Sequence, residues 1–204
     1  MRLPTLVLSW LSPLVAIMTS AAADLGTLGP YALRDVDGRP HTAADREGAE
    51  AVVYCLLGTE CPVSNGYAPA MQRLAEKYAP RGVRFIGVYC EPEVTAEVAR
   101  RHGEEYGLKF PRLLDPAHEL IGRTGAKTMP TMVVVGPSGA IAYRGRIDDR
   151  WSPQGKRRDA PRTRELEDAL EAVLAGRAPT VSETPTFGCP LPRPRAEGNG
   201  GARE

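Results

Sequence analysis

The chain has 204 residues, with 26 lysines and arginines against 25 aspartates and glutamates, so its formal net charge is +1 and no strong basic field attracts nucleic acid. An apolar content of 42% is enough to bury a core, and the length suits one domain with terminal extensions. Four cysteines are too few for a disulfide scaffold in such a chain. They are typical of a redox or metal site in a domain that folds without them.

The first 23 residues are typical of an export signal. Arg2 precedes an apolar run that ends at Met18, and three alanines before Asp24 offer a small-residue cleavage site. The run is shorter than the ~20 apolar residues that a spanning helix needs, so an uncleaved anchor is the less favoured interpretation. We therefore expect a protein exported to the bacterial periplasm or another extracytoplasmic space, with no membrane association once residues 1–23 are removed.

A hairpin is predicted ahead of the central elements. Residues 28–33 alternate weakly in hydropathy, and the Asp-Val-Asp-Gly stretch at 35–38 is a turn signal before His41. This hairpin is expected at the periphery of the fold.

The central feature of the chain is a cysteine between a predicted strand and a predicted helix. Ala51–Leu57 is continuously apolar, which is typical of a strand buried on both faces in a parallel sheet. Pro62 suits the first position of a helix, and apolar residues then recur at helical spacing up to Tyr78. Cys61 therefore lies at or beside a helix N-terminus, where free N–H groups and the helix dipole stabilise a thiolate. A small buried core cysteine is the alternative.

A second apolar strand, Val83–Tyr89, follows this helix and ends at Cys90. The strand–helix–strand unit predicts a right-handed crossover between parallel strands. Cys61 and Cys90 should therefore lie at the same edge of the sheet, where open α/β folds place their sites.

A proline-containing junction follows a helix predicted over 95–106 and a short helix near residue 121. The junction is Thr-Met-Pro-Thr over residues 128–131. Because proline cannot donate to a strand ladder, Pro130 must stand at the start of the apolar run 132–135. Its preceding peptide bond is a candidate for the cis form.

An antiparallel hairpin completes the predicted sheet. A turn at 137–139 returns the chain into a strand over 140–147, and a last helix covers 166–174. The loop 148–161 between them carries Trp151 among charged residues. It is interpreted either as a rim that contacts substrate or as an ordinary solvated loop.

The C-terminal segment from residue 177 onward is rich in Pro, Gly and Thr and is predicted to be a flexible tail. One apolar island in it, residues 187–191, carries Cys189. We therefore divide the chain into a signal peptide (1–23), a domain (24–176) and a tail (177–204).

The order of these elements resembles the thioredoxin-like superfamily: a strand, a cysteine-headed helix, a strand, a helix and a Thr-Met-Pro-Thr junction before an antiparallel hairpin and a last helix. The resemblance covers about residues 27–176. The N-terminal hairpin and the insert at 106–111 are similar to the redoxin group, which includes alkyl hydroperoxide reductases, thiol-specific antioxidant proteins and TlpA-like exported thioredoxins. This resemblance implies an α/β fold with a mixed central sheet flanked by helices.

The resemblance also implies an activity. Proteins of this group are thiol-disulfide oxidoreductases or antioxidant proteins that act on protein or small-molecule thiols and disulfides. They would take electrons from an external reductant and need no cofactor. Function must nevertheless be argued from the site, because one fold serves many activities.

By this resemblance Cys61 is the attacking thiol, and Pro130 matches the cis-proline that lies against it in thioredoxins. The Cys-x-x-Cys motif of thioredoxins is here Cys-Pro-Val-Ser, so Ser64 stands where the second cysteine would be. Ser64 is therefore included in the predicted catalytic set. Substrate contacts are expected from four residues around the site: Thr59, Met129, Thr131 and Trp151.

A lone attacking cysteine needs a second thiol to resolve a mixed disulfide. Cys55 lies within an apolar strand and is interpreted as core, and Cys90 suits either the site or the core. Cys189 has the most favourable context, because nothing in the fold requires burial of its apolar island; an incidental tail cysteine is the alternative. The twelve residues 177–188 can span up to ~40 Å, enough to bring Cys189 back to Cys61.

Two other functions share this fold. A peroxiredoxin-like thiol peroxidase would carry Pro-x-x-x-Thr-x-x-Cys, but the Pro and Thr positions are Tyr54 and Gly58 here. A copper-binding module would hold Cu(I) on Cys61 and Cys189, although such proteins use Cys-x-x-x-Cys with a histidine, and residue 65 is asparagine. The three histidines show no zinc-type spacing, so no metal site is predicted.

Overall fold

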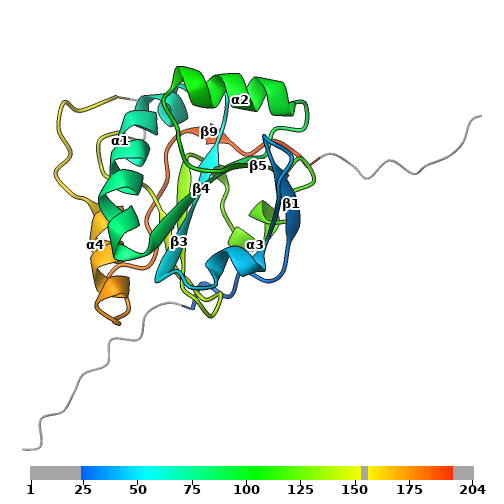
Figure 1. Ribbon diagram of the computed structural model, residues 1–204. Helices are drawn as coiled ribbons and strands as arrows, with labels where there is room; N and C mark the ends of the chain where they lie inside the picture. Colours follow the sequence, from blue (N-terminus) through cyan, green and yellow to red (C-terminus); the bar gives the residue numbers. More distant parts are fainter. Residues whose placement is uncertain (1–23, 153–155, 195–204) are drawn as a thin grey trace, which may run out of the picture.

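Seven strands form one mixed sheet at the centre of the fold. The computed structural model describes residues 24–152 and 156–194, so the predicted signal segment 1–23 lies outside the described residues. The strands are β1 (Ala32–Asp35), β2 (Pro40–Thr42), β3 (Ala51–Leu57), β4 (Val83–Tyr89), β5 (Arg112–Leu114), β7 (Thr131–Val135) and β8 (Ile141–Gly145). Their order across the sheet is β2-β1-β5-β4-β3-β7-β8 (Figure 1).

The middle of the sheet is parallel and its flanks are antiparallel. β3 runs parallel to β4, which runs parallel to β5, whereas β7 and β8 form the predicted hairpin beside β3. All seven residues of β3 are buried, because this strand has neighbours on both sides and packed layers on both faces. Because both faces of β3 are buried, its sequence is continuously apolar rather than alternating.

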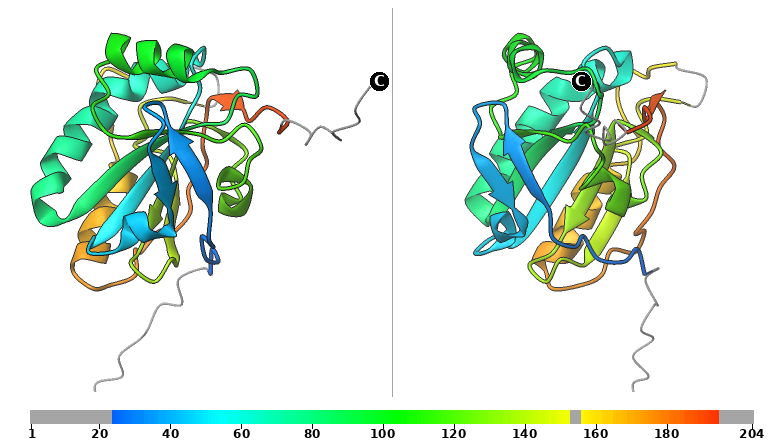
Figure 2. Two further views of the ribbon diagram at one scale, coloured as in Figure 1. Left: turned by 45° about the vertical axis from the view of Figure 1, so that its right-hand side comes forward. Right: turned by 90° about the vertical axis from the view of Figure 1, so that its right-hand side faces the viewer.

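Helices cover both faces of the sheet. They are α1 (Pro62–Tyr78), α2 (Ala96–Glu105), α3 (Ile121–Thr124) and α4 (Glu165–Leu174), with 3-10 turns η1 (Ala43–Arg46) and η2 (Ala79–Arg81). Alternate residues of β3 separate two apolar clusters. Val53 packs with α1 and α4 on one face, and Val52 packs with α3 and the N-terminal segment on the other. Figure 2 shows α1 and α4 on the same side of the sheet.

The predicted fold class, an α/β fold with a mixed sheet flanked by helices, is confirmed. The N-terminal hairpin is formed by β1 and β2, with Leu33 opposite His41. The short helix predicted near residue 121 begins there, as α3. None of the helices in the described part of the chain has the length and apolarity needed to cross a membrane.

The C-terminal segment lies against the domain, which its interpretation as a flexible tail did not anticipate. It bonds to β8, the last strand of the sheet, where Arg144 N donates to Ser182 O (2.9 Å) and Thr184 N donates to Arg144 O (3.1 Å). It then forms β9 (Cys189–Pro190), which pairs antiparallel with β6 (Thr128–Met129). Figure 1 shows this orange segment running from α4 to β9. Side-chain hydrogen bonds also hold the segment in place: the Thr184 hydroxyl bonds to Tyr143, and the Thr186 hydroxyl bonds to Thr128.

Candidate active site

Cys61 lies where the sequence predicts it, at the N-terminus of α1. It is the N-cap residue, with extended backbone angles, and Pro62 occupies the first turn. β3 and β4 end together beside it, since Leu57 is opposite Tyr89. Only 2% of Cys61 is exposed, and its thiol lies 3.3 Å from Met129 O, to which it can donate.

The surroundings of Cys61 favour a thiolate. Burial by itself would raise the pKa of this thiol, but hydrogen bonds from Ser64 and from Cys189 outweigh it and lower the pKa below its ordinary value. Each of these two residues contributes a backbone N–H and a side-chain donor. A sulfur that accepts several hydrogen bonds at a helix N-terminus is stabilised in its charged form.

Cys189 is the partner of Cys61 in this arrangement. β9 places it opposite Met129 in the β6–β9 pair, half-buried against the apolar cluster that contains Cys61. Burial, followed by the hydrogen bond to Cys61 and the charges of Cys61 and Glu91, raises the pKa of Cys189 to about 11. At neutral pH the pair is therefore one thiolate-prone sulfur and one protonated thiol that donates to it.

The junction between β6 and β7 has the geometry that the sequence predicts. The Met129–Pro130 peptide bond is cis. The backbone of Met129, expected to be available to a substrate chain, is already paired with Cys189. Thr131 turns inward: it is 1% exposed, and its hydroxyl donates to Thr128 O at 2.6 Å. The structure therefore does not bring the Thr131 side chain to the surface of the site.

Three other predicted site residues differ in their burial and partners. Ser64 is 1% exposed, and its Oγ also accepts from Gly58 N at 3.4 Å. Thr59 N and Oγ1 both donate to Glu91 Oε1, at 2.7 and 2.9 Å, so the Thr59 hydroxyl proton is already used. Trp151 is partly buried and lines a small cleft together with Pro130, Tyr67 and Phe187. The cleft lies between the loop after β8 and the tail.

The remaining cysteines are core residues by burial. Cys55 is fully buried in β3, and burial strongly raises the pKa of its thiol. Cys90 is also fully buried, and burial, followed by the charges of Glu91 and Asp115, raises its pKa to about 12. Both thiols are therefore protonated and shielded at neutral pH. Cys189 is the cysteine whose hydrogen bonds lower the pKa of Cys61.

Glu91 is a residue that the sequence interpretation missed. It follows the end of β4, and its carboxylate holds the loop before Cys61 through Thr59. Its Oε2 atom is buried and has no hydrogen-bond partner among the described residues. Burial raises the pKa of Glu91, against hydrogen bonds that lower it. Its position directly after Cys90 at the sheet edge is the signal that could have identified it.

A buried histidine network holds the same loop from the opposite side. Tyr89 OH lies 2.6 Å from His102 Nδ1, and His102 Nε2 lies 2.9 Å from Asn65 Oδ1. Asn65 Nδ2 donates to Thr59 O at 3.1 Å, so its Oδ1 must accept from His102. Burial lowers the pKa of His102, which keeps it neutral. Nothing in the spacing of the histidines pointed to this network.

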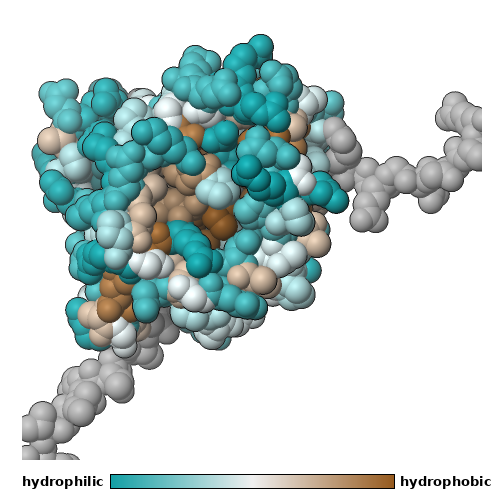
Figure 3. All heavy atoms as spheres, viewed as in Figure 1, coloured by the Kyte–Doolittle hydropathy of each residue, from teal (hydrophilic) through white to brown (hydrophobic). Residues whose placement is uncertain are grey.

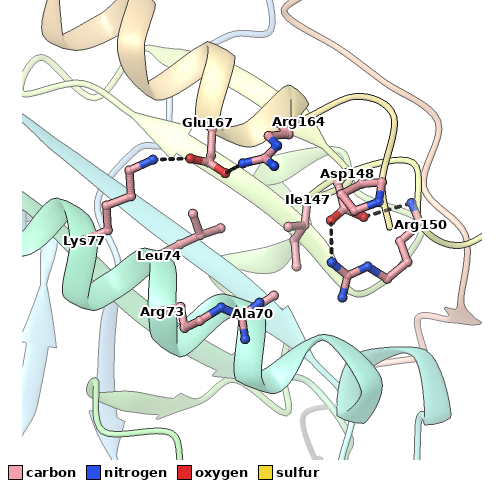
Figure 4. Close-up of a pocket in the computed structure, with 10 residues that line it drawn as sticks. Ala70, Arg73, Leu74, Lys77, Ile147, Asp148, Arg150, Arg164 and Glu167 are labelled. Atoms are coloured by element: carbon pink, nitrogen blue, oxygen red, sulfur yellow. Dashed lines mark hydrogen bonds and ion pairs between the residues drawn. The ribbon is translucent and has the colours of Figure 1, made fainter. Parts of the chain in front are cut away.

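Larger cavities lie away from the cysteines. Figure 4 shows a groove of about 330 Å³ between α1 and α4, with basic side chains at its rim: Arg73, Lys77, Arg150 and Arg164. A second cavity of about 490 Å³ lies between η1, the end of α1 and the start of β4. Figure 3 shows apolar side chains gathered in a hollow near the centre of the face that is drawn in Figure 1. Within the described ranges, no three His, Cys, Asp or Glu side chains gather as metal ligands.

Comparison with known proteins finds a family and several similar sequences and structures. Residues 27–144 match the AhpC/TSA family. The thiol-disulfide oxidoreductase ResA from Halalkalibacterium halodurans is 31% identical over 112 residues, a match that covers 54% of this chain and 61% of ResA, less than two thirds of its length. An uncharacterized conserved protein from Geobacillus kaustophilus is 27% identical with a TM-score of 0.73, over 84% of this chain and 92% of that protein.

The fold is thioredoxin-like. The thioredoxin domain of a thiol-disulfide oxidoreductase from Bacteroides vulgatus superposes with a TM-score of 0.52 at 16% identity, over 59% of this chain and 86% of that domain. At this identity the likeness concerns the fold alone. The match to the family, in contrast, spans more than half of the chain and includes β3, α1, Cys61 and the cis-proline. The chain therefore belongs to the AhpC/TSA family.

Proposed function

We propose that this protein is a thiol-disulfide oxidoreductase in which Cys61 attacks a substrate disulfide and Cys189 resolves the product. One observation carries the proposal: the tail strand β9 places Cys189 opposite Met129, whose carbonyl oxygen lies 3.3 Å from the Cys61 thiol, so that the two cysteines shift each other's pKa. The name of the relative ResA, a thiol-disulfide oxidoreductase, is in keeping with it.

The proposed reaction has two exchange steps. The Cys61 thiolate attacks one sulfur of the substrate disulfide, so that a Cys61–substrate bond forms, the substrate S–S bond breaks and one thiolate leaves. Cys189 then loses its proton to solvent and attacks the Cys61 sulfur. A Cys61–Cys189 disulfide forms, and the second substrate thiolate leaves. The substrate has gained two electrons, and an external thiol reductant returns the protein to its dithiol form.

The other residues of the site have supporting roles in this mechanism. Ser64 donates to the Cys61 thiolate through its N–H and hydroxyl, which keeps the nucleophile charged. When Cys61 is protonated, its thiol can donate to Met129 O, and Pro130 and Trp151 line the cleft next to the tail. Protein or small-molecule disulfides would enter at this cleft. We further propose that residues 1–23 direct export, which N-terminal sequencing of the mature protein tests: it should begin at Asp24.

The decisive experiment is disulfide mapping. The reduced protein is treated with one equivalent of an oxidised dithiol, digested without reduction, and its linked peptides are identified by mass. We expect a Cys61–Cys189 link, which the variants Cys61→Ser and Cys189→Ser both abolish. A link between Cys61 and Cys90, or an oxidised protein without any internal link, would overturn the proposal.

Peroxide reduction is the rival activity within this family. Tyr54 stands where peroxidases of this kind have proline, and it is fully buried with its hydroxyl 2.9 Å from that of Tyr31. Gly58 stands where they have threonine, so the position has no hydroxyl. We therefore expect disulfide reduction to exceed peroxide consumption when both are measured with the same reductant; the reverse ratio would favour the peroxidase.

A further inference from the structure

The tail strand approaches the cis-proline junction more closely than an ordinary residue allows. An ideal Cβ built on Gly188 would lie 2.1 Å from Met129 O, 2.9 Å from Met129 C and 3.2 Å from Pro130 Cδ. Unstrained contacts between nonbonded carbon atoms lie at about 3.5–4.0 Å. We propose that Gly188 is a positioning residue, whose missing side chain allows Cys189 to reach Cys61; this inference rests on the proposed function.

The atoms that Gly188 faces have little freedom to move. Two of them belong to the backbone of Met129, which is paired in β6, and the third to the ring of Pro130. Met129 O is also the atom that lies 3.3 Å from the Cys61 thiol. A side chain at residue 188 would therefore push the tail away from the group that contacts the nucleophile.

The tail cannot relieve such a clash by sliding along β6, because contacts on both sides fix its register. Before Gly188, the hydroxyls of Thr186 and Thr128 lie 2.5 Å apart. After it, Leu191 N donates to Lys127 O at 2.9 Å. The remaining response is displacement outward, which increases the distance between the two sulfurs.

This displacement should affect one step of the reaction and spare the other. The first exchange requires only the Cys61 thiolate and a substrate. The second requires Cys189 to attack the Cys61 sulfur while the substrate sulfur leaves, and misplacement of a nucleophile by about 1 Å can slow a reaction by roughly a hundredfold. If Gly188 had a purely structural role, its replacement would lower stability without slowing the second exchange relative to the first.

The test follows both steps in a single turnover. Reduced full-length protein is mixed with one equivalent of dithiobis-nitrobenzoate, which releases one coloured thiolate when Cys61 attacks and a second when Cys189 resolves the adduct. For Gly188→Ala we expect an unchanged first phase and a second phase slowed roughly ten- to a hundredfold. Gly188→Val should slow the second phase further.

The control variant is Gly176→Ala, at the residue directly before the tail. Gly176 has a φ of +67° and no atom within 4 Å of an ideal Cβ, so alanine there costs backbone strain without touching the site. It should leave the second phase at the wild-type rate. The unchanged first phase of the Gly188 variants serves as their check for correct folding.

The outcomes separate this inference from the function on which it rests. If the wild type shows no second phase, or if Cys189→Ser retains one, Cys189 is not the resolving thiol and the proposed function fails. If the wild type has a second phase that Cys189→Ser lacks, and Gly188→Ala matches the wild type, the positioning role of Gly188 is refuted. A first phase that slows with the second refutes it also.

Discussion

At the scale of single residues, the two site cysteines have opposite protonation preferences. Hydrogen bonds from Ser64 and Cys189 lower the pKa of Cys61 in spite of its burial, whereas burial and the charge of Cys61 raise the pKa of Cys189. The same contact thus stabilises a charge on one sulfur and opposes it on the other. In the proposed mechanism, the hydrogen bonds that the Cys61 sulfur accepts therefore distinguish the attacking thiol from the resolving thiol.

Alkylation against pH should reveal this asymmetry. Because a lowered pKa increases the thiolate fraction at neutral pH, Cys61 should react with iodoacetamide at a lower pH than an ordinary cysteine. Cys189 should become reactive only as the pH approaches about 11. In Cys61→Ser the pKa of Cys189 should fall, since the neighbouring thiolate is gone. Faster labelling of Cys55 or Cys90 at neutral pH would contradict the assignment.

Replacing Glu91 tests whether its charge slows the second exchange or assists it. Its negative charge contributes to the raised pKa of Cys189, so Glu91→Gln should lower that pKa and speed the second exchange at neutral pH. Glutamine can still accept from Thr59, which preserves the loop. Glu60→Gln, at an exposed neighbouring position, is the control and should have a smaller effect. A slower second exchange in Glu91→Gln would instead indicate that this carboxylate takes the proton of Cys189.

At the scale of elements, the tail has two separable parts. Residues 182–184 hydrogen-bond to β8, and residues 189–190 pair with β6. Ending the chain after Thr186 removes β9 and Cys189 but retains the contacts to β8. We expect this truncation to leave Cys61 reactive and to make mixed disulfides accumulate, as seen in intact mass spectra after exposure to a small disulfide.

Ending the chain after Ala178 removes both parts and serves as the comparison. It should accumulate the same mixed disulfides, but it should also unfold at a lower denaturant concentration, because Thr184 no longer bonds to Tyr143 and Arg146. If both truncated proteins, ending after Thr186 and after Ala178, resolve mixed disulfides as fast as the wild type does, the tail has no part in the exchange.

Most of the elements could be predicted from the sequence, because their signals are local. The buried run of β3, Pro62 at the start of α1 and the proline before β7 each constrain the backbone at their own position. The site was predicted less completely. The docking of the tail depends on contacts between residues far apart in sequence, such as Ser182 with Arg144, and no periodicity encodes them. The role of Glu91 was missed for the same reason, because Thr59 lies 32 residues before it in the chain.

At the scale of the whole molecule, oxidation would link the tail to the start of α1. Cys61 and Cys189 are separated by most of the described chain, so their disulfide would close a very long loop. In the chain-entropy model, a loop of about 100 residues or more corresponds to roughly 4 to 5 kcal/mol of stabilisation. We therefore expect a higher free energy of unfolding for the oxidised protein than for the reduced one, measured by denaturant titration.

Cys189→Ser is the control for this measurement. It cannot form the link, and its stability should therefore be the same under oxidising and reducing conditions. An equal free energy of unfolding for the oxidised and reduced wild type would show either that the link does not form or that its strain cancels the entropic effect; peptide mapping of the same samples separates the two.

The contact between the tail and β8 has a further consequence for the protein during its synthesis. β8 is the last strand of the sheet, and the tail covers the backbone groups that it would otherwise leave open. An uncovered strand edge is a template for pairing with another chain. The covering segment follows all the strands of the sheet in the chain, so it leaves the ribosome after them. The sheet can therefore assemble before its edge is closed, and nascent copies pass through an interval in which they can pair with one another.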